Sequence, residues 1–156
     1  MKLVEVSEQN WLKVIFLSTS DKMPAICEEF VASNALSLVQ AQFEPFWVTK
    51  AIEAEDALVG FTMYGFVPED QQYVICRLMI DHKFQGKGYG RKAMELIIAE
   101  LQKNEDCDAI YLSTEPHNEV AKKLYKSLGF KSTNRVVDGE EEFVYMQQHV
   151  GETTSI

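Results

Sequence analysis

The stretch RLMIDHKFQGKGYGRK, residues 77–92, decides how this sequence is interpreted. Its apolar start runs into three glycines at alternate positions, Gly86, Gly88 and Gly90, and a helical pattern begins at once. Glycines let backbone N–H groups approach an anion closely, and a helix N-terminus adds a favourable dipole. Lys87, Arg91 and Lys92 supply positive charge at the same place. The stretch therefore predicts a strand, a pyrophosphate-binding turn and a helix.

Two common phosphate-binding motifs do not fit the spacing of these glycines. A P-loop needs G-x-x-x-x-G-K-[ST], which does not occur, and the dinucleotide fingerprint G-x-G-x-x-G fails because position 91 is Arg. A tight strand-to-helix turn without a ligand is the remaining alternative. The cluster of cations at the helix start argues against that alternative, because the rest of the chain is acidic.

Elements around this stretch follow from the spacing of apolar residues. We expect helices over about 7–18, 21–43, 88–104 and 118–128. The first would have Ser7 as cap and Trp11, Leu12, Ile15 and Phe16 on one face, and the second would have a break near 32–34. We expect strands over about 2–6, 48–54, 57–66, 73–81, 109–113, 130–137 and 141–148, with tight turns at Glu55-Asp56 and Asp138-Gly139. This order predicts an α/β fold, a mixed central sheet of six to seven strands with helices on both faces.

Length and composition set the class of protein. The 156 residues suit one domain over 1–150, followed by a short tail over 151–156. No apolar run approaches the roughly 20 residues of a membrane helix, and the stretch 3–6 is too short for a secretory signal. Cys27, Cys76 and Cys107 have no CxxC spacing, so we expect buried reduced thiols in a cytoplasmic protein. The scattered histidines predict no metal site.

The charge balance bears on partners. The chain has 15 Lys and Arg against 24 Asp and Glu, a formal net charge of −9. Such a chain repels a phosphate backbone, so we expect no nucleic-acid partner. It attracts a cationic small molecule, although the charge taken alone favours plain solubility as its explanation.

Two motifs resemble those of a known family. Residues 85–90, Gln-Gly-Lys-Gly-Tyr-Gly, fit [Q/R]-x-x-G-x-[G/A], and Asn118, Ala121, Leu124-Tyr125 and Leu128-Gly129-Phe130 follow further along the chain. Both motifs and the order of elements resemble the GNAT family of N-acetyltransferases. The strings at 59–65, 77–81 and 84–88 more closely resemble the bacterial diamine and spermine/spermidine acetyltransferases of that family.

The resemblance implies a GNAT fold, in which central strands splay apart, and acetyl-CoA as cosubstrate without a metal. The pantetheine arm would pair with the backbone of the splayed strand. The residues implied in cofactor binding are Leu78, Met79, Ile80, Gln85, Gly86, Lys87, Gly88, Tyr89, Gly90, Arg91 and Asn118. Asn118 also suits a helix cap, and the two roles are compatible. A homodimer is common in the family.

Tyr125 matches the family tyrosine beside the thioester sulfur, although its helical spacing also suits a core aromatic. A phenol with pKa about 10 is a reasonable proton donor to a departing thiolate. A primary amine acceptor, with pKa about 10.4, must lose a proton before it attacks. No motif places a Cys or Ser as nucleophile, so we expect direct attack in a ternary complex, with a backbone amide near 79–80 polarising the carbonyl.

The carboxylate that takes this proton is open. Candidates on the acceptor side are Glu28, Glu29 and Asp81, with Glu44 and Glu115 as others, and Asp81 equally suits a cap. Arg77, inside an apolar strand, is expected in a structural ion pair. We expect an N-acetyltransferase acting on a polyamine or diamine. The alternatives are a peptide N-terminus, lysine, amino acid or aminoglycoside acceptor, and a non-catalytic acyl-CoA-binding module.

Overall fold

The computed structural model describes residues 1–20 and 33–147 of the chain. Its strands are β1 (Lys2–Glu5), β2 (Trp47–Ala54), β3 (Ala57–Val67), β4 (Gln72–Ile80), β5 (Ala109–Thr114), β6 (Lys131–Val137) and β7 (Glu140–Met146). Its helices are α1 (Trp11–Ile15), α2 (Asn34–Phe43), α3 (Tyr89–Leu101) and α4 (Glu119–Ser127), with a short 3-10 helix, η1, over His82–Phe84. Within these ranges the elements follow the predicted order.

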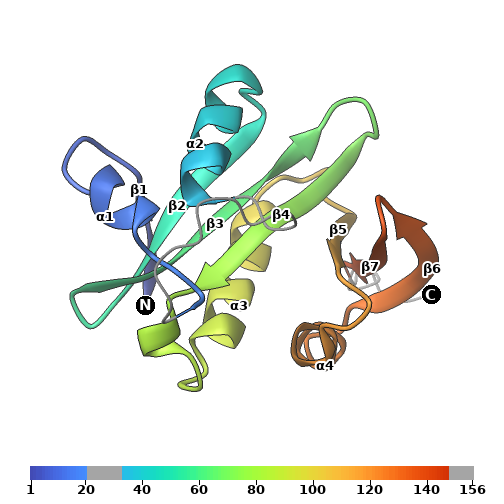
Figure 1. Ribbon diagram of the computed structural model, residues 1–156. Coiled ribbons are helices and arrows are strands. Elements are labelled where there is room, and N and C mark those ends of the chain that lie inside the picture. Colours follow the sequence, from blue (N-terminus) through green and yellow to red (C-terminus); the bar gives the residue numbers. More distant parts are fainter. Residues whose placement is uncertain (21–32, 148–156) are drawn as a thin grey trace, which may run out of the picture.

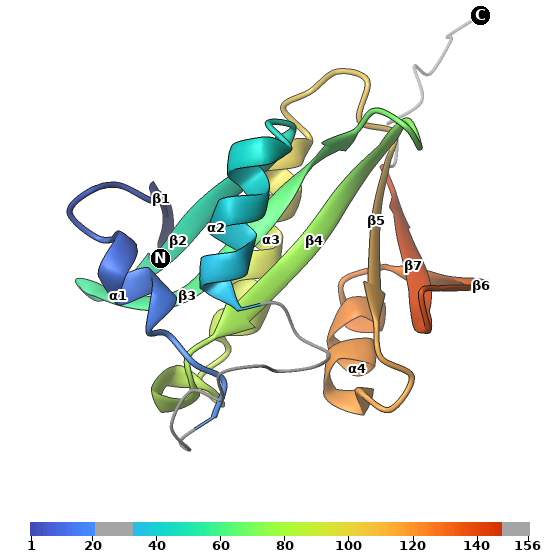
Figure 2. The same cartoon turned by 45° about the horizontal axis from the view of Figure 1, so that its top comes forward.

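The described strands form one mixed sheet in the order β1-β2-β3-β4-β5-β7-β6. Strands β4 and β5 run parallel, whereas the other neighbours are antiparallel. Helix α2 covers one face of the sheet and α3 the other, as both views show (Figure 1, Figure 2). We call these the α2 face and the α3 face. The arrangement confirms the predicted α/β fold with helices on both faces.

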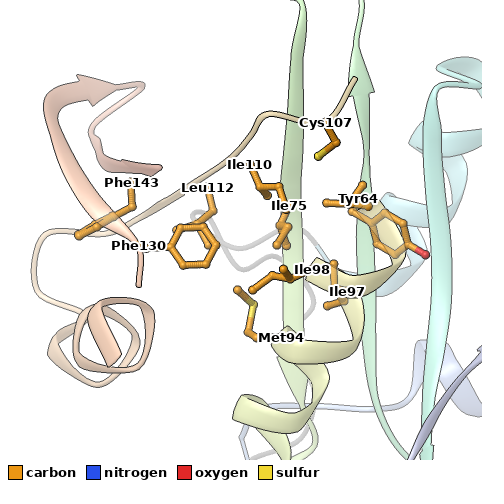
Figure 3. Close-up of a cluster of buried hydrophobic side chains, with 11 residues drawn as sticks. Tyr64, Ile75, Met94, Ile97, Ile98, Cys107, Ile110, Leu112, Phe130 and Phe143 are labelled. Carbon is orange, nitrogen blue, oxygen red and sulfur yellow. The ribbon is translucent and has the colours of Figure 1, made fainter. Parts of the chain in front are cut away.

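The larger core lies on the α3 face. Every apolar position predicted for this helix is buried, and these positions are Ala93, Met94, Ile97, Ile98 and Leu101. They pack with residues from both halves of the sheet, including Ile75 on β4, Ile110 on β5 and Phe143 on β7 (Figure 3). Helix α3 therefore supports both β4 and the β5–β7 half, which fixes where the two halves meet.

A smaller core lies on the α2 face. Val14, Phe61 and Met63 are fully buried there, and Trp47 and Met79 pack against them. Side chains alternate between the two faces of a strand, so this face also receives Arg77, two residues before Met79. The α2 face of β4 thus carries a charged residue beside a packed core.

Both predicted tight turns are present. Glu55 and Asp56 have φ of 50° and 61°, and Asp138 and Gly139 have φ of 51° and 83°. Two consecutive left-handed residues make the turn that joins antiparallel strands most readily. The second turn places Glu140 at the start of β7, directly after the reversal of the chain.

The first helix differs from the prediction. It begins at Trp11, and the side chain of Asn10 accepts from the N–H of Ser7, so Ser7 is not its cap. Trp11, Leu12 and Phe16 are exposed, and Val14 is the buried residue. A five-residue helix has a single turn to place against the sheet, so spacing alone does not decide which side packs. The predicted start of the next helix lies outside the described residues, and α2 begins after Ser33, whose hydroxyl accepts from the N–H of Leu36 at 3.1 Å.

Cysteine burial also differs from the prediction in part. Cys107 is buried as expected, Cys76 is exposed, and Cys27 lies outside the described residues. No described helix is long and apolar enough to cross a membrane. Within residues 1–20 and 33–147, no group of three His, Cys, Asp or Glu side chains is placed to hold a metal ion.

Candidate active site

Strands β4 and β5 separate soon after they meet. Tyr73 pairs with Ile110 and Val74 with Tyr111, and the rest of β4 has no strand beside it on this side among the described residues. The two strands diverge visibly toward the C-terminal end of β4 (Figure 1). The sheet therefore has an internal open edge, which is the splay that the resemblance implies. We call the space between the diverging strands the gap.

The open edge offers specific backbone groups. The N–H of Asp81 donates to the carbonyl of Val59 on β3 at 2.8 Å, and an antiparallel ladder alternates its hydrogen-bonded pairs. Met79 therefore exchanges its hydrogen bonds with Phe61 on β3. The backbone groups of Leu78 and Ile80 point the other way, into the gap. Of the three residues predicted for this edge, Leu78 can pair with an extended ligand through its backbone, and Ile80 can do so through its N–H.

A β-bulge lies where the gap begins. Met63 is opposite Arg77 and Tyr64 is opposite Ile75, so Cys76 is an extra residue on β4. A bulge bends its strand and increases the local twist. It separates the part of β4 that pairs with β5 from the part that does not, and it leaves Cys76 at the mouth of the gap.

The glycine turn lies at the end of the open edge and begins α3. Gly86 and Gly88 have φ of 76° and 78°, and a Cβ at either would meet nothing within 4 Å. No side chain caps the helix, so the first N–H groups of its first turn remain available. The cationic side chains of Lys87, Arg91 and Lys92 are on the surface of the same turn. The turn therefore has the features that an anion site requires, and its role in binding pyrophosphate stays a prediction.

Two polar side chains hold this turn in place rather than project from it. The amide of Gln85 donates to the carbonyl of Ile80 at 3.0 Å. Asp81 is 5% exposed, and its two carboxylate oxygens accept from the N–H groups of Ser18 and Lys83, each at 3.0 Å. Both oxygens of Asp81 are therefore occupied by backbone donors, which favours the cap over the substrate contact that the sequence left open.

Helix α4 borders the gap from the other side. The side chain of Asn118 accepts from the N–H of Ala121 at 3.1 Å, which is the predicted cap. Gly90 of α3 would place a Cβ 3.7 Å from Leu124, and Arg91 bonds to the hydroxyl of Ser127. Helix α4 is thus fixed against the start of α3, so the anion site and α4 share one end of the gap.

Tyr125 on α4 combines a packed ring with a free hydroxyl. Its ring lies 6.0 Å from that of Phe130 and 6.1 Å from that of Phe143. Its hydroxyl makes no hydrogen bond within the described parts of the chain. Burial, and then the charge of Glu140, raise the pKa of the phenol, so it stays protonated at neutral pH. A fixed ring with a free protonated hydroxyl is what a proton donor requires.

Known proteins match both the sequence and this geometry. The model of the acetyltransferase (GNAT) family matches residues 11–130. The chain belongs to the GNAT family. The spermine/spermidine N(1)-acetyltransferase of Bacillus subtilis (strain 168) is 31% identical over 141 residues, which are 81% of this chain and 93% of that protein. GNAT members of this kind are N-acetyltransferases, and this chain is one of them.

Solved structures share the fold of this GNAT chain. The PaiA N-acetyltransferase of Thermoplasma acidophilum, in complex with coenzyme A, has a TM-score of 0.69 at 16% identity, covering 94% of this chain and 98% of that one. A spermidine N-acetyltransferase chimera from Vibrio cholerae and hSSAT has a TM-score of 0.70 at 15% identity, covering 94% and 96%. Both likenesses confirm the GNAT fold.

The α2 face of the acetyltransferase carries a polar network beside the gap. Arg77 donates to the side-chain carbonyl of Gln40 at 3.1 Å, and the amide of Gln40 donates to Glu44 at 2.8 Å. The indole N–H of Trp47 donates to the same carboxylate oxygen at 2.8 Å. The predicted ion pair of Arg77 is therefore wrong for the described residues, because the Gln40 amide stands between the guanidinium and the carboxylate.

This network also affects the charge of Glu44. The hydrogen bonds from Gln40 and then Trp47, with a smaller effect of Arg77, hold the pKa of Glu44 below its ordinary value. Glu44 is thus held ionised. It can attract a cation but is a weak proton acceptor.

Sequence reasoning missed the residues on the far side of the gap. Ser113 of β5 follows Tyr111 by two residues, as Cys76 of β4 follows Val74, so the parallel register brings Ser113 level with the bulge. The Ser113 hydroxyl donates to the carboxylate of Glu140 at the start of β7. Three consecutive glutamates at 140–142 resemble a solvated charge run. The signal that could have found Glu140 is the alternation of side chains along a strand, which places Glu140 and Glu141 on opposite faces of the sheet.

The remaining predicted candidates are placed as follows. Glu28 and Glu29 lie outside the described residues, so their role stays a prediction. Glu115 is exposed in the loop before α4. Tyr89 begins α3, where its ring lies 6.5 Å from Phe84.

Proposed function

We propose that this acetyltransferase moves the acetyl group of acetyl-CoA to a primary amine of a polyamine or diamine, with spermine and spermidine as first candidates. The observation that carries the proposal is the Bacillus subtilis relative, named for spermine and spermidine and 31% identical over 81% of this chain. The net charge of −9 supports a cationic acceptor.

The residues at the gap fit acetyl-CoA on their own chemistry. The backbone groups of Leu78 and the N–H of Ile80 suit an extended pantetheine arm, which adds to a sheet edge as a strand does, whereas the carbonyl of Ile80 already accepts from Gln85. The turn of Gly86 and Gly88 suits the pyrophosphate, because N–H groups, cations and open space coincide there. The thioester supplies the activated acetyl group, and the N–H of Ile80 is the donor available to polarise its carbonyl.

The acceptor approaches from the α2 face, opposite α4. Attack by the amine nitrogen on the thioester carbon breaks the C–S bond, and Tyr125 gives its proton to the departing sulfur. Because burial and then Glu140 raise the pKa of the phenol above its ordinary value, Tyr125 still holds this proton at neutral pH. The transfer is direct, since it needs no nucleophile from the protein.

A CoA-release assay with acetyl-CoA and a panel of amines tests the proposal. The panel contains spermine, spermidine, putrescine, lysine, an aminoglycoside and a short peptide. We expect a higher kcat/KM for spermine or spermidine than for the others. Turnover of the peptide alone would keep the acetyl transfer and overturn the polyamine acceptor. Binding of acetyl-CoA without release of CoA for any amine would favour a non-catalytic acyl-CoA-binding module.

A further inference from the structure

Three carboxylates with side chains on the α2 face are the candidates to contact an acceptor. They are Glu44 after α2 and Glu140 and Glu142 on β7. The odd-numbered neighbours on β7 point to the other face, as Glu141 shows by its ion pair with Lys122 of α4 at 3.0 Å. The three differ in the partners that they already have.

Two of the three carboxylates are engaged. Glu44 accepts two hydrogen bonds on one oxygen, from Gln40 and Trp47. Glu142 is 8% exposed, accepts from the hydroxyl of Thr133 at 2.9 Å, and has the guanidinium of Arg135 at 3.6 Å. The hydrogen bonds on Glu44 hold its pKa down and make it a poor acceptor for a proton, and Glu142 is already occupied by a hydroxyl and a guanidinium.

Glu140 has a single polar contact and no cation within the described residues. That contact is the Ser113 hydroxyl, which fixes the carboxylate on the wall of the gap level with the bulge at Cys76. The charge of Glu140 also acts on groups of α4 and β4, the two other elements beside the gap. It raises the pKa of Tyr125 after the larger effect of burial.

The effect on Cys76 of β4 has the same origin. Although Cys76 is exposed as a residue, desolvation of its thiol raises its pKa first, Arg77 lowers it, and Glu140 and Glu44 raise it further. Glu140 therefore lies within electrostatic reach of β4, across the gap, and of α4, which borders it.

We propose that Glu140 receives the ammonium group of the acceptor and takes its proton before attack, as the general base of the reaction. This rests on the proposed function and assigns the base that the sequence left open. One proton passes from the ammonium to Glu140 and then to solvent. The nitrogen then bonds to the thioester carbon, the C–S bond breaks, and sulfur takes the proton of Tyr125. The second proton lost by nitrogen, as the amide forms, returns to Tyr125.

The charged and titratable groups that face Glu140 are Tyr125 on α4, Cys76 and Arg77 on β4, Glu44 beyond them, and Glu142 with Arg135 on the hairpin. Tyr125 stays protonated at neutral pH, because burial and then Glu140 raise its pKa. A pH dependence between pH 6 and 10 therefore reports on the ionisation of the amine, and its change in a Glu140 variant reports on the base.

The experiment compares Glu140→Gln with the neighbouring Glu141→Gln, whose side chain points to the other face. We measure kcat/KM for spermidine from pH 6 to 10, and the Kd of acetyl-CoA as a check on folding. We expect Glu140→Gln to lose about 10²-fold at pH 7, and to recover about tenfold per pH unit as the neutral amine becomes available. Glu141→Gln should keep the profile of the unmodified protein.

A second variant keeps the test decisive if Glu140→Gln binds acetyl-CoA poorly. Glu140→Asp retains a carboxylate, so it should lose less activity and keep the pH profile of the unmodified protein. Equal losses at all pH values, or the same loss in Glu141→Gln, would overturn the assignment of Glu140. Absence of turnover by the unmodified protein with every amine would instead overturn the proposed function, and this assignment with it.

Discussion

At the scale of single residues, Tyr125 combines a structural role with a proposed chemical one. Its ring packs against Phe130 and Phe143, as the helical spacing predicts for a core aromatic. Its hydroxyl nevertheless has no partner in the described structure. The core and catalytic interpretations of this residue are therefore compatible, because the ring serves one and the hydroxyl the other.

Tyr125→Phe separates the two roles. We expect kcat to fall about 10²-fold, because the sulfur loses its proton donor, while the Kd of acetyl-CoA and the thermal midpoint change little. The raised pKa also predicts that the unmodified protein keeps its kcat up to the ordinary phenol pKa of about 10. Tyr145→Phe removes a hydroxyl from the same aromatic cluster and is the control. Equal effects of both variants would contradict the assignment.

Gly88 allows the proposed anion site to be tested by a single substitution. Gly88→Glu adds a side chain at a φ of 78° and a negative charge where N–H groups and cations receive the pyrophosphate. We expect acetyl-CoA binding, measured by calorimetric titration, to fall below detection while the circular dichroism spectrum is retained. Gly139 has a similar φ in the turn between β6 and β7, so Gly139→Ala is the control and should leave the Kd of acetyl-CoA unchanged. Undiminished binding by Gly88→Glu would remove the anion site.

At the scale of elements, β4 contains the features on which the site depends. Its first part pairs with β5, its bulge ends that pairing, and its second part ends in the glycine turn. Its other edge is fixed by β3, where Gly60 lies opposite Ile80. A Cβ on Gly60 would be 2.3 Å from the carbonyl oxygen of Met79, so the two backbones approach as closely as glycine permits.

Gly60→Ala tests this dependence. The added methyl must displace the backbone of β4, which we expect to lower the free energy of unfolding by about 1–3 kcal/mol. The displacement falls on the open edge, so the Kd of acetyl-CoA should also rise severalfold. Gly139→Ala again serves as control, because it strains a turn without moving β4. Loss of stability with unchanged acetyl-CoA binding would contradict the role given to this edge.

The elements were predicted from the sequence more completely than the site. Helix α3 was predictable because all five of its apolar positions repeat at helical spacing and all are buried. Helix α1 was not, because its single turn buries Val14 rather than the more apolar-looking stripe of Trp11 and Phe16. The cofactor side of the site follows from contiguous motifs. The acceptor side does not, since Glu44, Ser113 and Glu140 come from three distant segments that only the register of the sheet brings together.

At the scale of the whole molecule, the two halves of the sheet have different tasks. Strands β1 to β4 and α3 hold the open edge and the anion site, whereas β5, β6, β7 and α4 bring Tyr125 and Glu140 to the gap. The shared core on the α3 face, which includes Ile75 and Phe143, keeps the two halves together (Figure 3). The proposed site of the reaction is where the two halves separate.

The net charge of −9 acts over the whole molecule. If the acceptor is a polyamine, we expect its KM to rise about three- to tenfold between low salt and 0.5 M NaCl, because salt screens long-range attraction. The KM of a monoamine, with a single charge, should rise less. Initial rates with spermine and with a monoamine at matched ionic strengths measure the difference. The same response for both amines would argue against electrostatic attraction of the acceptor.

By the proposed function, acetyl transfer occurs in the gap between β4 and β5, with the cofactor on the side of α4 and the amine on the α2 face. A crystal structure of the protein with CoA and spermine would locate both ligands. We expect a pantetheine arm along Leu78 and Ile80, a sulfur within hydrogen-bond distance of the Tyr125 hydroxyl, and a spermine nitrogen against Glu140. A sulfur remote from Tyr125, or spermine bound away from the α2 face of the gap, would contradict it.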